Sequence, residues 1–174
     1  MIREARPGEL AAVGDLRVAA YEAGGFLSAG YAPELRALGT QGDGTVLVAI
    51  ADDEPAVEIA GTIMLVTWPM AGELVGGPDE AEIRALAVAP GAQSGGVGTG
   101  LLLTALNWAE LAGARRVVLS TLPEMRAAHR LYERTGFRRL PERDWSPRDG
   151  VLLLAYSLEL ASLEKNSLGQ GQPG

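Results

Sequence analysis

Two periods of apolar residues alternate along the chain and predict both helices and strands. Spacing of three and four between apolar positions predicts about four helices, at residues 7–24, 32–38, 98–112 and 124–135. Runs rich in β-branched residues predict about seven strands, at residues 2–6, 45–51, 57–68, 82–88, 116–120, 137–140 and 151–160. The resulting order of strand, two helices, three strands, helix, strand, helix and two strands is typical of a mixed α/β (α+β) domain.

Short breaks in this pattern refine the expected connections. Residues 52–55 read Asp-Asp-Glu-Pro, a turn that would join the strands on either side into a hairpin. Gly136 directly follows the last predicted helix, where a left-handed residue commonly ends helices. Residues 162–174 are polar and rich in Gly and Gln, so they are expected to be a mobile tail. We therefore expect one domain over residues 1–161.

Composition places the chain among globular proteins and indicates where it works. Its 174 residues suit one domain, and 47% apolar residues argue against a wholly disordered chain. No apolar run is long enough to span a bilayer, and residues 1–7 lack the apolar stretch of a secretory signal. The chain has no cysteine and therefore no disulfides. We expect a cytoplasmic protein without a membrane partner.

Charge and metal-ligand content exclude further classes. The net charge is −7, and nucleic-acid binders usually carry a basic patch, so DNA or RNA is not expected as a partner. The excess of acidic residues either attracts a cationic molecule or serves solubility. Without cysteine, and with one histidine, the chain offers neither a Cys-based zinc site nor a His-rich site, so no metal is expected.

The most informative segment is residues 81–103, where a strand runs into a glycine-rich turn and then a helix. Glycine allows positive φ and close approach of a ligand, and the first turn of a helix has unpaired N–H groups. This combination suits a phosphate group, although a tight turn that only connects two elements has the same composition. A Walker loop is excluded because the only lysine is Lys165, and the glycine spacing does not fit a dinucleotide fingerprint.

Two motifs in this half of the chain resemble one known family. Residues 88–98 read Val-x-Pro-x-x-Gln-x-x-Gly-Val-Gly, which resembles the Gln/Arg-x-x-Gly-x-Gly/Ala pyrophosphate loop of the GNAT acetyltransferase superfamily. Residues 128–137 read Ala-His-Arg-Leu-Tyr-Glu-Arg-Thr-Gly-Phe and resemble its Ala-x-x-Leu-Tyr-Glu-x-x-Gly-Phe block. Both motifs occur in order on the expected elements, and the predicted element order agrees with the family from residue 2 to residue 160.

The resemblance implies a mixed central sheet in which two splayed strands form a cleft for acetyl-CoA, the cosubstrate. Backbone groups of Leu86, Ala87 and Val88 would pair with the pantetheine arm. The pyrophosphate would be bound by the turn and the first residues of the helix, namely Gln93, Ser94, Gly95, Gly96, Val97, Gly98 and Thr99.

Three positions depart from the family pattern. Ser94 stands where relatives often have Gly, Thr99 where they often have Arg or Lys, and Met125 where they often have Asn. A neutral loop can still bind pyrophosphate through backbone N–H groups, but one cationic contact is missing. A methionine cannot make the hydrogen bonds of an Asn amide.

The resemblance also assigns the proton transfers. Tyr132 matches the position of the general acid that protonates the departing thiolate, the alternative being a packed helix residue. Glu82, on the cofactor strand, is the candidate base through a water, and Glu80 is its substitute. The alternative for Glu82 is a solvated residue or a partner of Arg84. His129 is interpreted as a partly exposed helix residue.

The leading functional interpretation is an N-acetyltransferase in which a primary amine attacks acetyl-CoA directly. Two alternatives remain: a transferase for another acyl-CoA, and a non-catalytic module that senses acetyl-CoA. The acceptor is a small-molecule or peptide amine, and the aromatic residues in segments that often line its pocket are Tyr21, Phe26, Tyr31, Trp68 and Trp145. The apolar residues 151–154 either complete the core or contact a second copy of the chain, which leaves a homodimer open.

Overall fold

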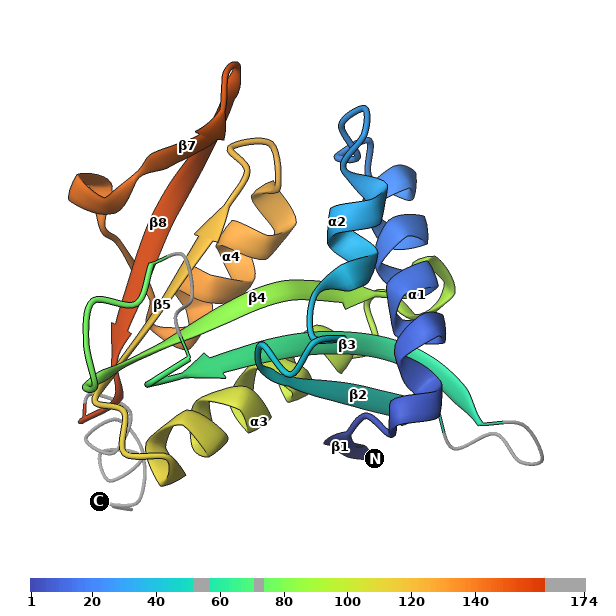
Figure 1. The fold of residues 1–174 in the computed structure, drawn as a ribbon, viewed down its shortest axis with the longest axis horizontal. Coiled ribbons are helices and arrows are strands. Elements are labelled where there is room, and N and C mark those ends of the chain that lie inside the picture. The colour runs from blue at the N-terminus through green and yellow to red at the C-terminus, as the bar shows by residue number, and fades with distance from the viewer. Residues whose placement is uncertain (52–56, 71–73, 162–174) are drawn as a thin grey trace, which may run out of the picture. The chain divides into compact units, whose positions relative to one another are not determined.

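The computed structural model describes residues 1–51, 57–70 and 74–161, and its elements follow the predicted order (Figure 1). The α-helices are α1 (Leu10–Ala23), α2 (Ala32–Ala37), α3 (Val97–Leu111) and α4 (Arg126–Thr135). The strands are β1 (Ile2–Glu4), β2 (Thr45–Ala51), β3 (Glu58–Thr67), β4 (Glu80–Val88), β5 (Arg116–Thr121), β6 (Arg138–Arg139), β7 (Trp145–Arg148) and β8 (Val151–Glu159). Short 3-10 helices cover Pro7–Glu9, Pro90–Ala92 and Pro141–Arg143. The mixed α/β class is thereby confirmed.

The chain forms two compact units, and β4 and α3 each continue from one into the other. Among the described residues, the first unit contains 1–51, 57–66 and 83–107, and the second contains 67–70, 74–82 and 108–161. The predicted turn at 52–55 and the predicted tail at 162–174 lie outside the described residues. One domain over residues 1–161 stays a prediction.

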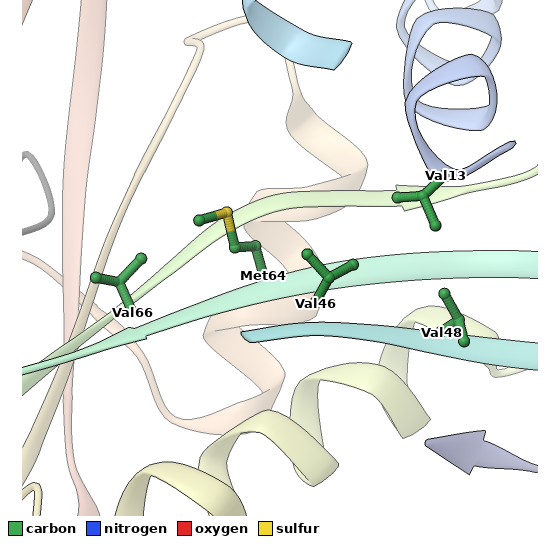
Figure 2. Close-up of a cluster of buried hydrophobic side chains, with 5 residues drawn as sticks. All are labelled: Val13, Val46, Val48, Met64 and Val66. Atoms are coloured by element: carbon green, nitrogen blue, oxygen red, sulfur yellow. The ribbon is translucent and has the colours of Figure 1, made fainter. Parts of the chain in front are cut away.

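In the first unit, β1 to β4 lie side by side in sequence order. The pairs β1–β2 and β2–β3 are antiparallel, with Val46 opposite Met64, so the predicted hairpin is confirmed. Successive side chains of a strand point to opposite faces. Val46, Val48, Met64 and Val66 consequently share one face, where they form a buried cluster with Val13 of α1 (Figure 2). Figure 1 shows α1 and α2 on this face of the strands and α3 on the other.

The buried face of helix α1 does not follow its apolar residues alone. Leu16 and Val18 are apolar but only half-buried. The buried residues are Val13, Gly14 and Arg17. The reason is α2: a Cβ at Gly14 would lie 3.3 Å from the Cα of Arg36, so the glycine lets the two helices approach closely. Contact with a second helix, rather than with the sheet alone, decides which face of α1 is covered.

In the second unit, β8 is the central strand. It pairs antiparallel with β5, β6 and β7, and β5 lies next to the start of β4. Strand β7 is not predicted by the sequence, because Pro147 interrupts a four-residue run whose register also shifts between Trp145 and Arg148. Gly136 ends α4 with φ of 110°, as predicted. Among the described helices, none is long and apolar enough to cross a membrane.

Candidate active site

The glycine-rich turn has the backbone geometry of an anion-binding loop. After the 3-10 turn Pro90–Ala92, Ser94 and Gly96 adopt positive φ values of 72° and 79°, and α3 begins at Val97. The N–H of Gly100 donates to the Gly96 carbonyl at 3.0 Å, which starts the helical pattern. Earlier N–H groups in the first turn of an α-helix have no intrahelical partner and carry partial positive charge. The turn therefore presents N–H groups to an anion.

The predicted pyrophosphate residues are brought together on this turn. Gln93, Ser94, Gly95, Gly96 and Thr99 are exposed, whereas Val97 and Gly98 are half-buried at the start of α3. No residue from 90 to 100 is acidic, so no fixed negative charge within the segment opposes a phosphate. Exposure, backbone direction and charge fit a pyrophosphate, and the binding role of these residues stays a prediction.

Ser94 supplies a physical reason for the glycine that relatives often have at this position. A side chain with positive φ costs roughly 1–2 kcal/mol because its Cβ approaches the neighbouring carbonyl. Ser94 adopts this conformation and remains exposed. The serine therefore adds local strain at a position where the resembled motif often has a glycine.

Strand β4 contains a second strained residue, which the sequence does not reveal. Ala85 has φ of 52° within an otherwise extended strand. Left-handed residues in strands occur at β-bulges, which interrupt the ladder and redirect the backbone that follows. The backbone that follows belongs to Leu86, Ala87 and Val88, the predicted partners of pantetheine. Strain of this kind is concentrated at functional sites.

Gly61 of β3 packs closely against β4 and the start of α3. A Cβ at this position would lie 2.8 Å from Cγ1 of Val97, 2.9 Å from Cδ1 of Leu101 and 3.1 Å from the carbonyl oxygen of Ala87. The neighbouring Ala60 accepts a hydrogen bond from the N–H of Ala89 at 2.8 Å. Because Gly61 has no side chain, β3 can pack directly against the first residues of α3, which follow the predicted pyrophosphate turn.

Glu82, the predicted base, is buried in the second unit. It is 1% exposed, and its Oε2 accepts a hydrogen bond from the N–H of Leu74 at 3.2 Å. The alternative of a solvated strand residue is therefore wrong. A glutamate that is almost completely buried in a strand is uncommon, so Glu82 stays a functional candidate, and pairing with Arg84 remains the alternative.

Glu80, the substitute base, is engaged in a structural network. Both of its oxygens accept hydrogen bonds from Nη1 of Arg143, at 2.9 and 2.8 Å, and Oε1 also accepts the N–H of Gly76 at 2.8 Å. Nη1 of Arg116 lies 3.9 Å from Oε2. These donors occupy both carboxylate oxygens of Glu80, which leaves few lone pairs for a substrate or a water. The arrangement therefore favours Glu82 over Glu80 as the base.

Tyr132, the predicted acid, is fixed on α4 by two aromatic neighbours. It is 6% exposed, and its ring centroid lies 5.7 Å from that of Phe137 and 6.1 Å from that of Tyr156. Burial raises the pKa of Tyr156, and its hydrogen bond with Glu133 adds to the effect. The packing that the alternative interpretation expects is therefore present, and the acid role of Tyr132 stays a prediction.

His129 and Met125 have structural roles near Tyr132. Nε2 of His129 lies 2.9 Å from the carbonyl oxygen of Leu122, and since a carbonyl only accepts, that nitrogen carries a proton. His129 is half-buried, as the sequence interpretation expects. Met125 precedes α4 without a side-chain cap, and its sulfur accepts a weak bond from the Thr121 hydroxyl at 3.7 Å. The contact at this position therefore differs from that of an Asn.

Comparison with known proteins identifies the class. The model of the acetyltransferase (GNAT) family matches residues 11–137, so the chain belongs to the GNAT family and is an acyltransferase. No curated protein matches the sequence.

Solved structures of this family share the fold. A Desulfovibrio desulfuricans protein described as a GNAT acetyltransferase is 22% identical, with a TM-score of 0.69 over 92% of this chain and 98% of its own. A Staphylococcus aureus GNAT acetyltransferase is 18% identical, with a TM-score of 0.71 and the same coverage of both chains. A Salmonella typhimurium protein described as an acetyltransferase, solved with its cofactor acetyl-CoA, is 20% identical, with a TM-score of 0.64 over 92% of this chain and 93% of its own.

Proposed function

We propose that the chain transfers the acetyl group of acetyl-CoA to a primary amine by direct attack. The observation that supports this most is the turn with positive φ at Ser94 and Gly96, which opens α3 shortly after the strained strand β4. In this proposal, the pantetheine arm of acyl-CoA binds along β4, and its pyrophosphate binds the turn that follows. The Salmonella typhimurium structure, which contains acetyl-CoA, supports this choice of donor.

The proposed reaction balances with two proton transfers. Acetyl-CoA supplies an activated thioester; the amine nitrogen forms a new C–N bond to the acetyl carbon as the C–S bond breaks. The amine loses one proton, which Glu82 accepts through a water, and the departing sulfur gains one from Tyr132. An N–H of β4 stabilises the negative charge that develops on the carbonyl oxygen. A chain without cysteine suits this route, since no thiol is available as an intermediate acyl carrier.

Two other functions fit the same family. A larger acyl-CoA would use the same turn, because none of the residues from 93 to 99 contacts the acyl end in this proposal. A sensor that binds acetyl-CoA without turnover would explain the departures at Ser94, Thr99 and Met125. The buried carboxylate of Glu82 favours a catalytic protein over a sensor, because binding alone does not require a proton acceptor on β4.

The proposed setting follows from the sequence interpretation. The acceptor is a small-molecule or peptide amine, and neither nucleic acid nor membrane is a partner. The protein works in the cytoplasm, and a homodimer through residues 151–154 is left open.

The test is the release of CoA with acetyl-, propionyl- and butyryl-CoA against a panel of amines. We expect turnover with acetyl-CoA, and Tyr132→Phe to lower kcat about a hundredfold or more, the scale of general acid catalysis. Glu82→Gln should lower kcat/KM most at low pH, where less of the amine is neutral. Tyr156→Phe, which removes the hydroxyl of a buried tyrosine packed near Tyr132, distinguishes loss of a hydroxyl in this aromatic cluster from loss of the acid. Full activity of both Tyr132→Phe and Glu82→Gln across pH would refute the assigned roles.

A further inference from the structure

A buried arginine joins α1 to the end of α2. Arg17 is 0% exposed, and its Nη1 donates to the carbonyl oxygens of Leu38 at 2.7 Å and Leu35 at 3.3 Å. These carbonyls lie at the end of α2, where cationic side chains commonly cap a helix. The cap accounts for one nitrogen of the guanidinium and explains why α1 turns this face towards α2.

This cap does not explain why the other two nitrogens of the Arg17 guanidinium are buried. Among the described residues, neither Nε nor Nη2 of Arg17 has a hydrogen-bond partner, and both atoms are buried. A guanidinium has five N–H donors, and its Nε–Nη2 edge presents two parallel N–H groups that match the two oxygens of a carboxylate. Burying this edge without an acceptor is costly, and an anion bound there would offset the cost.

The surroundings of Arg17 are positive and aromatic. Burial lowers the pKa of Arg17 to about 10, and the positive charge of Arg84 contributes to the decrease. Burial likewise raises the pKa of Tyr21 to about 12, so its hydroxyl stays protonated at neutral pH. Asp43 is the acidic group that acts on Arg17, and its carboxylate already accepts the N–H groups of Gly39 at 3.2 Å and Gln41 at 3.3 Å. An added anion would therefore meet the positive charges of Arg17 and Arg84 and the negative charge of Asp43.

We propose that the amine acceptor is an amino acid or a related molecule whose carboxylate binds the Nε–Nη2 edge of Arg17. This inference rests on the proposed function, which makes an amine the acceptor. Two residues that act electrostatically on Arg17 are Tyr21, in the last turn of α1, and Tyr31, directly before α2. Because the edge is buried, a carboxylate reaches it only after neighbouring side chains move.

A binding experiment tests the carboxylate without turnover. Melting temperatures are measured in the presence of CoA with N-acetyl-glycine, N-acetyl-methionine and N-acetyl-glutamate, each compared with its α-carboxamide. Charge-assisted hydrogen bonds predict that at least one acid binds about tenfold to a hundredfold more tightly than its amide. Equal binding of acids and amides, or no binding of either, would overturn the proposal.

Variants then assign the preference to Arg17. Arg17→Lys keeps a charge that can donate to the α2 carbonyls but loses the planar fork, so the acid-over-amide preference should fall about tenfold. Arg36→Lys, an exposed arginine on α2 that pairs with Asp15, is the matched control and should leave the preference unchanged. If the Arg17→Lys protein folds and still binds acids more tightly than amides to the same degree, the assignment to Arg17 is contradicted. If the variant does not fold, the comparison of acids with amides on the wild-type protein decides the proposal.

The two proposals fail in different ways. If no amine releases CoA but acids still bind more tightly than amides, the proposed function fails and the carboxylate site stands. If amines turn over and the unprotected amino acids show no lower KM than their amides, the proposed function stands and the carboxylate site is refuted.

Discussion

Substitution of Gly61 by alanine tests whether the close packing of β3 determines the position of the predicted pyrophosphate turn. The added Cβ would lie within 3.1 Å of a backbone oxygen on β4 and within 2.9 Å of two side chains of α3. Overpacking of a buried site costs about 1–3 kcal/mol. Alanine regains about 0.4–1 kcal/mol by restricting the unfolded chain. The midpoints of these two ranges leave a net loss of about 1.3 kcal/mol, or roughly 3–5 °C in melting temperature for a chain of this size.

The assay pairs thermal unfolding with binding of acetyl-CoA. Because the clash falls on Val97 and on the carbonyl of Ala87, Gly61→Ala should also weaken acetyl-CoA binding. Gly91→Ala is the matched control: it lies just before the turn, and a Cβ there meets no atom within 4 Å among the described residues. The control should be neutral or slightly stabilising. A Gly61→Ala protein with unchanged stability and unchanged acetyl-CoA affinity would refute the packing argument.

Three further predictions follow from strain, ion pairs and burial. Ser94→Gly should stabilise the protein by about 0.5–1 kcal/mol, because relief of positive-φ strain exceeds the added freedom of the unfolded chain, and urea unfolding measures this; a loss of stability would contradict it. Hydrogen bonds from Arg3 lower the pKa of Glu9 to about 2, so Glu9→Gln should destabilise at neutral pH. The difference from wild type should shrink as pH falls from about 4.5 towards 2, and a constant difference would contradict it. Arg143→Met should cost about 1–3 kcal/mol in urea unfolding by leaving Glu80 buried without its partner, and Glu80→Gln combined with it should recover part of the loss.

Element order and the predicted turn are accessible from the sequence because local signals specify them. The hairpin of β2 and β3 and the glycine after α4 each follow from residues within a few positions. Strand β7 is missed since its pairing with β8 depends on a partner strand that supplies the ladder, while Pro147 argues against a strand locally.

The details of the candidate site depend on tertiary contacts that no local pattern reports. Alanine does not favour the left-handed conformation, so the sequence does not predict the positive φ of Ala85. Helical periodicity assigns Arg17 to solvent, although the approach of α2 buries it. The alternation of polar and apolar residues along β4 does not predict the burial of Glu82 either. Its carboxylate accepts a hydrogen bond from Leu74, which lies in the segment before β4. The family motif identifies the binding turn, while packing between elements determines which polar groups are buried beside it.

The central claim is that the turn from Gln93 to Thr99 binds the pyrophosphate of acetyl-CoA. The most direct measurement is the melting temperature of the protein with acetyl-CoA, with NAD and ATP as controls. At a hundredfold excess over its dissociation constant, a ligand that binds only the folded state stabilises it by about 2.7 kcal/mol. This corresponds to an increase of roughly 5–11 °C for a chain of this size. A selective shift with acetyl-CoA is the predicted result, and no shift with acetyl-CoA or longer acyl-CoAs would contradict the account.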